Sequence, residues 1–591
     1  MTSSKYSAAK RVFFAVLSVT AITAASAFAY FQSKPAPTVR LVDIKPVRII
    51  KEGDKVLIDF GKTWFGKIDI TPNAANQDRT ITVIMKETSE PKPFEAIGPE
   101  PPAVRFELVP DIKLGKSTLT VPLPERDSRL MPERIGAVMP LRYVEIIGWK
   151  GEFPADAIGM LAAVAQRYQD TGTVTFKGAG DAELNAIWEL SSHTMAATSF
   201  AALFVDGDRE RLPYEADAYI NQLGWHYTTG ETSVPRRTFE HLVENPSWPT
   251  EWQAHMLLMA WADYMHTGDK AFLAKHYERL KFLTYHELMG DIDGLVDVSS
   301  MSPEFKARTR IKEKVEDIVD WLPTERDGHE MRPKNTVTNA FIYISLVKMS
   351  HIAKALDKTD DQKTFTDLAD KLRDGLFAHA SLPNGLLSDG VGSTHTSAHS
   401  LFIPLAFGLV PEEKKPLFIA ALKDRIASYD GGFPGSIFTA QYLLEALYQE
   451  GEDQAALELI VNRTDRGWLH AIEKYGATVT HEAWDIKYKY NEDWTHAWGA
   501  APANIMPRFM AGVEPVEPGW KKWRLSPSRA LTQNLQAVIP TPHGSILLQV
   551  QPANQRLAVT VPEGSTAVYT QDSGVVMELG AGEHTLTWKA H

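Results

Sequence analysis

Helical periodicity dominates the middle of the chain, from Asp181 to the region of Pro515. Apolar residues recur there at three- and four-residue spacing, and short turns bearing Gly or Asp separate one segment from the next. The clearest segments are residues 184–203, 218–227, 252–266, 270–289, 336–356, 362–378, 412–427 and 436–450. We count roughly a dozen candidate helices and find no repeat of fixed length that would indicate an open solenoid. Antiparallel helical hairpins that close into a ring are therefore the economical arrangement.

Strand patterns flank the helical region on both sides. Before it, alternating and β-branched residues occur at 56–60, 80–85, 117–121 and 142–147, and these signals fade after Gly148. After it, strands are expected at 535–539, 545–550, 557–561, 567–570 and 584–588. A chain of 591 residues is too long for one compact unit, so we predict a multidomain α+β protein. Its expected parts are a signal peptide at 1–29, a linker at 30–39, an N-terminal antiparallel β-sandwich domain at 40–170, a helical domain at 171–513 and a C-terminal β-sandwich domain at 514–591.

The first 29 residues have the order of a secretory signal peptide. Lys5, Lys10 and Arg11 precede an apolar run at 12–25, and a small-x-small site follows at 27–29. An uncleaved membrane anchor is the alternative, because the apolar run nearly reaches spanning length. Either way the body of the protein is expected outside the cytoplasm, periplasmic or secreted. We expect no membrane contact for the mature protein.

Composition and missing motifs exclude several classes of protein. The chain has no cysteine, which rules out disulfides and a thiol nucleophile. The net charge of -12 and the lack of any basic stripe with interleaved aromatics argue against a nucleic-acid partner. Phosphate-binding loops, serine nucleophile elbows and zinc-binding helices have no signature here. His395 and His399 could share a helix face and bind a metal, but no third ligand is near in sequence. We favour polar positions lining a cleft, and we predict no metal and no cofactor.

One charge-dense stretch interrupts the helical region. Seven of the twelve residues from Asp206 to Asp217 are charged, and apolar helical segments lie on both sides. Gly207 and Pro213 break the helical pattern, so the stretch is predicted to be a loop that holds carboxylates and guanidiniums close together. A solvated surface loop is the alternative for such a cluster.

A second cluster, at 476–485 and 494–498, combines carboxylates with aromatic residues. Sugars present apolar C–H faces and hydroxyl edges, so a saccharide site combines tryptophan platforms with carboxylates and histidines. Most of the 15 tryptophans are expected in the core, but Trp484, Trp494 and Trp498 stand beside charged residues.

The two clusters together supply the pair of carboxyl groups that glycosidic hydrolysis needs. One group must be protonated to donate to the leaving oxygen, and the other must be ionised to activate water or to attack carbon. Glu210 and Glu482 are the natural pair. Arg209 and Arg211 flank Glu210 and would lower its pKa, so an acid working near neutrality requires these arginines to point toward other partners.

The charge-dense loop resembles the signature loop of the family 78 glycoside hydrolases, the α-L-rhamnosidases. In that loop an Asp precedes a core bearing Arg and Glu, and another Asp lies seven residues beyond the glutamate, as Asp217 follows Glu210 here. Further stretches are similar to the family and follow its order: 59–66, 142–148, 184–188, 320–323, 408–413, 432–433, 467–468 and 476–482. The markers span most of residues 55–525.

The resemblance implies an (α/α)6 barrel, hydrolysis with inversion, Glu210 as general acid and Glu482 as general base. It also implies that Asp206, Arg209 and Asp217 hold the sugar, and His496 matches a histidine of a later site loop. The predicted substrate contacts are Asp206, Arg209, Tyr214, Asp217, Trp321, Trp484, Trp494 and His496. The leading hypothesis is an exo-acting, inverting α-L-rhamnosidase whose partner is a rhamnose-containing oligosaccharide or glycoside.

The loop also departs from the family pattern. The family carries Cys-Pro after the first Asp, where this chain has Gly207 and Asp208, and Gly-Trp-x-Gly before the last Asp, where this chain keeps an aromatic as Tyr214. Other functions therefore stay open. They are a glycosidase for another deoxy-sugar, a pentose or a uronic acid, a non-catalytic saccharide-binding relative, and a polysaccharide lyase.

Overall fold

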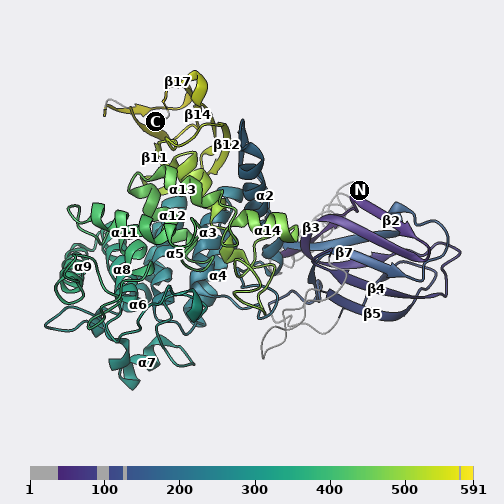
Figure 1. Cartoon of the computed structure of the whole chain (residues 1–591), viewed down its shortest axis with the longest axis horizontal. Helices are drawn as coiled ribbons and strands as arrows, with labels where there is room; N and C mark the ends of the chain where they lie inside the picture. Colours follow the sequence, from purple (N-terminus) through teal and green to yellow (C-terminus); the bar gives the residue numbers. More distant parts are fainter. Residues whose placement is uncertain (1–37, 90–105, 124–129, 572–573, 590–591) are drawn as a thin grey trace, which may run out of the picture.

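The computed structural model describes residues 38–89, 106–123, 130–571 and 574–589 (Figure 1). The predicted signal peptide and all but the end of the predicted linker lie outside these residues. Within them, none of the helices combines the length and the apolar character needed to cross a bilayer. An N-terminal sheet, a central body of helices and a C-terminal pair of sheets follow one another along the chain (Figure 1).

The N-terminal sheet contains eight antiparallel strands in the part of the chain that the structure describes. Their order is β1-β8-β3-β7-β4-β5, and β2 and β6 also pair with β3. The strands are β1 (Val39–Ile44), β2 (Arg48–Glu52), β3 (Lys55–Ile70), β4 (Thr80–Lys86), β5 (Phe106–Lys113), β6 (Leu119–Thr120), β7 (Met139–Ile147) and β8 (Ile158–Ala165). Alternation is clear in β3, where Val56, Ile58 and Phe60 are buried and their immediate neighbours are not.

Strand β8 lies beyond Gly148, where the sequence predicted that strand signals end, so that prediction is wrong. The last four residues of β8 are all buried, and they are small apolar residues. A strand covered on both faces loses the alternation by which strands are identified in sequence.

Fourteen α-helices follow among the described residues. They are α2 (Asp181–Ala197), α3 (Glu215–Thr229), α4 (Ser233–Glu244), α5 (His255–Thr267), α6 (Lys270–Leu283), α7 (Pro303–Thr309), α8 (Thr336–Ala355), α9 (Thr359–His379), α10 (His399–Ala406), α11 (Lys415–Ala427), α12 (Ala440–Gln449), α13 (Asp453–Ile460), α14 (Trp468–Tyr475) and α15 (Pro502–Ile505). Six of them, α3, α5, α8, α10, α12 and α15, contact one another in turn, and α15 returns to α3. The prediction of helical hairpins closing into a ring is confirmed.

Burial separates the inner helices from the outer ones. Every residue of α3 and of α10 is buried. Outer helix α9 buries only 5 of its 21 residues, at helical spacing. An inner helix such as α3 can therefore carry buried polar side chains from one end of the ring to the other.

Two sheets complete the chain. One contains β10 (Val513–Pro515), β11 (Lys522–Leu525), β15 (Thr566–Thr570) and β16 (Val576–Leu579), and the other contains β17 (Gly582–Thr587), β14 (Arg556–Val561), β13 (Gly544–Gln551), β12 (Asn534–Thr541) and β9 (Thr173–Lys177). Strand β9 precedes the first helix, yet it pairs with β12. The C-terminal sheets thus hold both ends of the helical region, and β9 belongs with them rather than with the helices.

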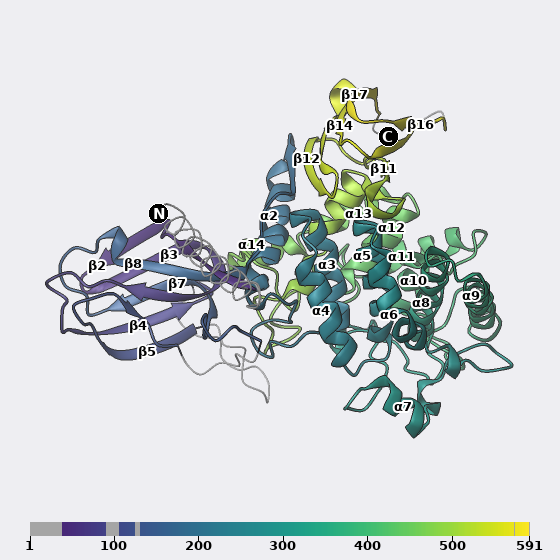
Figure 2. The same ribbon diagram turned by 180° about the vertical axis from the view of Figure 1, so that it is seen from behind.

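The N-terminal sheet packs against the helical body near the second carboxylate cluster. Thr63 of β3 donates its N–H to Thr478 Oγ1 at 2.9 Å, and its carbonyl oxygen lies 2.8 Å from His193 Nε2. Arg142 of β7 donates to Gly476 O at 3.1 Å. Figure 2 shows α14 on the side of the helical body that faces this sheet. The sheet therefore supports the segment that leads to Glu482.

Candidate active site

A cavity of about 200 Å³ opens at the N-terminal end of α3. Four segments that are distant in sequence line it, with the side chains Asp206, Arg209, Glu210, Tyr214, Asp217, Trp248, Trp252, Ile318, Trp321, Glu482, His496 and Trp498. Both predicted catalytic glutamates lie in this one cavity. So do all the predicted substrate contacts except Trp484 and Trp494.

The loop before α3 is fixed by its own side chains and by the N-terminal sheet. Asp206 holds the two ends of the loop together through two hydrogen bonds to Leu212. Its N–H donates to Leu212 O and its carboxylate accepts the Leu212 N–H, each at 2.8 Å. Arg211 pairs with the carboxylate of Asp208 and donates to Val138 O at 2.8 Å. Arg211 is thereby committed to partners other than Glu210, as the acid role requires. Arg209 does not meet that requirement, because its Nη2 lies 3.2 Å from Glu210 Oε1.

Arg209 is held mainly by the second glutamate. Its two terminal nitrogens each lie 3.2 Å from one oxygen of Glu482, which makes a bidentate pair. Lys489 Nζ lies 3.4 Å from Glu482, and the Asp493 N–H donates to it at 2.9 Å. Burial raises the pKa of Glu482, but the positive charges beside it, among them Arg209 and Lys489, outweigh burial and bring that pKa below its ordinary value. Glu482 is therefore ionised near neutrality, as a base must be.

Glu210 lies at the mouth of the cavity, with 38% of its side chain exposed. Tyr214 OH donates to its Oε2 at 2.6 Å, and Arg209 Nη2 lies 3.2 Å from its Oε1. Arg209 Nη2 also lies 3.2 Å from Glu482 Oε1. Because one nitrogen contacts both oxygens, Glu210 Oε1 and Glu482 Oε1 are separated by at most twice 3.2 Å. The two glutamates thus face one small space.

Asp217, in the first turn of α3, is a buried carboxylate without a hydrogen bond. It is 1% exposed, and neither oxygen has a partner among the described residues. His496 Nδ1 lies 3.7 Å away and also lacks a hydrogen-bond partner there. Burial raises the pKa of Asp217 well above its ordinary value and lowers that of His496 to about 3, so the imidazole is neutral. Buried polar groups without partners are costly, and hydroxyl groups of a bound ligand would satisfy both.

Two of the predicted tryptophan platforms need correction. Trp484 stacks on Phe433 with ring centroids 4.7 Å apart and donates to Gly435 O at 2.9 Å. Trp494 stacks on His481 at 4.8 Å. Because both rings are packed against other side chains and lie outside the cavity lining, we assign them a supporting position.

Trp248 and Trp252 line the cavity, and the sequence analysis missed them. They lie between α4 and α5, outside both carboxylate clusters. The one usable signal was Glu251, the carboxylate next to Trp252. Trp321 was predicted and does line the cavity.

His399 holds the segment that carries Trp321. Its Nε2 lies 2.7 Å from Asp320 Oδ2, and the Asp320 carboxylate also accepts the N–H of Trp321 at 2.7 Å. His395 precedes α10 and contacts Asp389 at 2.6 Å, so the expectation that the two histidines share a helix face is wrong. In the described ranges no group of three or more His, Asp and Glu side chains could hold a metal ion.

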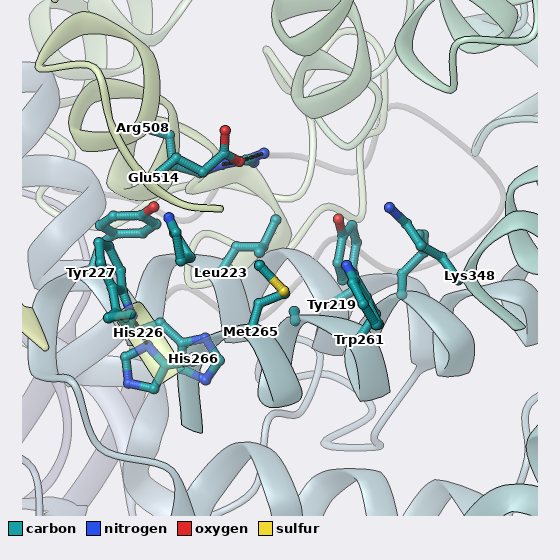
Figure 3. Close-up of a pocket in the computed structure, with 14 residues that line it drawn as sticks. Tyr219, Leu223, His226, Tyr227, Trp261, Met265, His266, Lys348, Arg508 and Glu514 are labelled. Atoms are coloured by element: carbon teal, nitrogen blue, oxygen red, sulfur yellow. Dashed lines mark hydrogen bonds and ion pairs between the residues drawn. The ribbon is translucent and has the colours of Figure 1, made fainter. Parts of the chain in front are cut away.

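A second cavity, of about 170 Å³, lies at the opposite end of α3 (Figure 3). His226 and Tyr227 of the last helical turns line it together with side chains of the C-terminal segment. Figure 3 shows Glu514 beside Arg508, whose nitrogens donate to Glu514 Oε1 at 3.0 and 2.8 Å. Arg524 holds the other oxygen at 2.8 Å. The carboxylate of this cavity is therefore fully paired and offers no free acid or base.

Comparison with known proteins agrees with the fold. A model described as the bacterial α-L-rhamnosidase 6 hairpin glycosidase domain matches residues 171–510, and a model of the bacterial α-L-rhamnosidase C-terminal domain matches residues 512–574. A curated α-L-rhamnosidase of Streptomyces avermitilis is 21% identical over 440 residues, which are 64% of this chain and 39% of that protein.

Two solved structures share the architecture. The α-L-rhamnosidase of Dictyoglumus thermophilum gives a TM-score of 0.75 at 20% identity, covering 94% of this chain and 64% of that chain. The Streptomyces avermitilis α-L-rhamnosidase complexed with L-rhamnose gives a TM-score of 0.74 at 18% identity, and the match covers 93% of this chain and 54% of that chain. The chain spans less than two thirds of the length of these relatives. Because the six-hairpin model alone covers more than half of the chain, this protein belongs to the bacterial α-L-rhamnosidase family of glycosidases.

Proposed function

We propose that the protein is an exo-acting, inverting α-L-rhamnosidase that releases terminal L-rhamnose from an oligosaccharide or glycoside. The observation that carries the proposal is that the Asp217 carboxylate and His496 Nδ1, both buried and without a hydrogen-bond partner among the described residues, line the same cavity as the two glutamates. Sugar hydroxyls can donate to the carboxylate and accept from or donate to the imidazole. The complex of the Streptomyces avermitilis relative with L-rhamnose supports the choice of sugar.

The two glutamates are assigned different roles by their surroundings. Glu210, half-exposed at the mouth and hydrogen-bonded by Tyr214, donates a proton to the leaving oxygen. Glu482, ionised between Arg209 and Lys489, accepts a proton from the attacking water. Trp321 and Trp248 offer ring faces for the apolar side of the sugar.

Inversion requires carboxyl groups roughly 6.5 to 9.5 Å apart, which leaves room for a water. Arg209 holds the nearest oxygens of the two glutamates at or below the lower end of that range. We expect the contact between Arg209 and Glu210 to open when the sugar enters, while the bidentate pair with Glu482 persists. The exo assignment is supported by the size of the cavity, about 200 Å³, which suits a single sugar ring at the chain end.

Proton NMR of a digest tests the proposal. With an aryl α-L-rhamnoside we expect free L-rhamnose, and the first anomer to appear is the β form. Release of the α form would contradict inversion. A panel of nitrophenyl glycosides separates the alternatives, since turnover of another sugar and not of rhamnose would contradict the substrate. Binding without turnover would indicate a saccharide-binding relative, and an unsaturated product absorbing in the ultraviolet would indicate a lyase.

We also propose that the protein acts in the periplasm or is secreted, which the order of charged, apolar and small residues in 1–29 supports. N-terminal sequencing of the protein from the periplasmic fraction should begin near Tyr30. A chain that starts at Met1 and stays with the membrane would contradict cleavage.

A further inference from the structure

We propose that Asp493 is a positioning residue that fixes the separation of the two glutamates, and that Gly207 is the residue that makes room for it. The proposal rests on the proposed function for the meaning of that separation. Asp493 itself does not line the cavity. It acts through the two loops that carry Glu210 and Glu482.

Asp493 contacts the loop of Glu210 through its side chain. The carboxylate is 3% exposed, and its two oxygens lie 3.1 and 3.2 Å from the backbone nitrogen of Arg209, which donates to them. Arg209 directly precedes Glu210 in the chain. The carboxylate therefore fixes the backbone from which the acid projects.

Asp493 contacts the base through its backbone. Its N–H donates to Glu482 Oε2 at 2.9 Å, and the Glu482 N–H donates to its carbonyl oxygen at 2.8 Å. The bidentate pair between Arg209 and Glu482 links the same two loops a second time. Contacts of Asp493 thus join the backbone next to Glu210 to Glu482 and set the distance between the two loops, while the Glu210 side chain can still turn away from Arg209.

Gly207 lies directly against the Asp493 carboxylate, and a residue with a Cβ atom would not fit at this position. A Cβ at position 207 would lie 2.4 Å from Asp493 Oδ2 and 2.6 Å from its Cγ, far inside contact distance. Gly207 has no positive φ, so its need for glycine is a need for room and not for conformation. The Asp493 side chain thus gives a physical reason for the departure of this loop from the Cys-Pro of the family pattern.

A double-mutant cycle of Gly207→Ala and Asp493→Ala tests the pairing. Gly207→Ala alone should reduce kcat roughly tenfold or more and lower Tm, because Asp493 must move. In the Asp493→Ala background the added methyl finds space, so the further loss should be less than about twofold. Equal losses in the two backgrounds would overturn the proposal. The Tm measurement needs no substrate, so it tests the pairing of Gly207 and Asp493 independently of the proposed function. If the proposed function is wrong, the wild type itself will show no turnover of the rhamnoside.

Asp493→Asn separates positioning from simple support of the fold. The amide keeps its shape and one acceptor for Arg209, so most of the kcat lost in Asp493→Ala should return, with KM near the wild-type value. Burial raises the pKa of Asp493 to about 7, so its side chain is uncharged at the low pH where Glu482 titrates, and the acid limb of the kcat/KM profile should stay at its wild-type position. A shifted acid limb would show that Asp493 acts through its charge, and no recovery of kcat would indicate a structural role only; either result would overturn the positioning role.

Discussion

The two ends of α3 carry cavities of similar size whose buried carboxylates differ in their pairing. At the N-terminal end the Asp217 carboxylate is buried with no hydrogen bond among the described residues, beside His496, whose Nδ1 also lacks one. At the C-terminal end Glu514 accepts three hydrogen bonds from Arg508 and Arg524. Proteins pair buried charges unless the unpaired state serves a purpose. His226 Nε2 in the distal cavity also lacks a partner among the described residues, so the two ends differ in their carboxylates and not in polar groups in general. The difference indicates that the unpaired carboxylate of Asp217 marks the functional end, while the paired carboxylate of Glu514 joins the helical ring to the C-terminal sheets.

The largest expected effect comes from removing the acid. Glu210→Gln should reduce kcat by about 10² to 10⁴-fold, the usual contribution of general acid catalysis. Glutamine keeps the shape and can still accept from Tyr214, so thermal unfolding should barely change. The matched control is Glu514→Gln in the distal cavity. It should keep near wild-type kcat but lose roughly 1.5 to 3 kcal/mol of unfolding free energy, because Arg508 and Arg524 lose the negative charge that both of them contact. A large loss of kcat in Glu514→Gln with little loss in Glu210→Gln would contradict the assignment of the active site to the N-terminal end of α3.

Asp217→Asn should show opposite effects on function and stability. Loss of charge-assisted hydrogen bonds to the sugar should lower kcat/KM by roughly 10 to 100-fold. Unfolding free energy should rise, because an amide costs less than a carboxylate when it is buried without partners. Steady-state kinetics and urea unfolding measure the two effects. A variant that is both fully active and less stable would show that Asp217 is satisfied within the free protein.

Trp321 and Trp484 distinguish a sugar platform from a packed ring. Trp321→Ala should raise KM for an aryl α-L-rhamnoside about tenfold, in line with the loss of an aromatic contact of roughly 1.5 kcal/mol, with little change in Tm. Trp484→Phe should lower Tm and leave KM alone. Kinetics and calorimetry of both variants check this, and a raised KM for Trp484→Phe alone would restore the platform role predicted from the sequence.

The smallest expected effect is on the pH dependence of stability. Burial, with the charge of Glu482, raises the pKa of Asp493 to about 7. A carboxyl whose pKa is raised by folding binds its proton more tightly when folded, so stability falls as pH rises from about 4, the unfolded value, to about 7. Asp493→Asn should flatten this fall by on the order of 1 kcal/mol, measured by urea unfolding at several pH values. Parallel curves for wild type and variant would contradict the assignment.

The sequence predicted the ring of helices because helical periodicity survives even in buried helices that keep a polar residue per turn. It predicted that Glu210 and Glu482 share a site, because charged clusters beside helix ends stand out from an apolar background, and the structure places both in one cavity. Their catalytic roles stay a prediction. It failed for Trp484 and Trp494, because a tryptophan next to a carboxylate in sequence can still pack its ring away from it. It also failed for β8, whose small apolar residues hide alternation, and for Asp493. The importance of Asp493 follows only from contacts between loops that are far apart in the chain.

The most direct test of the proposed site is a crystal structure of the Glu210→Gln protein soaked with an aryl α-L-rhamnoside. We expect the sugar ring between residue 210 and Glu482, with its hydroxyls on Asp217 and His496 and the distal cavity free of sugar. A sugar bound at the distal end of α3, or one that leaves both Asp217 oxygens without a partner, would contradict it.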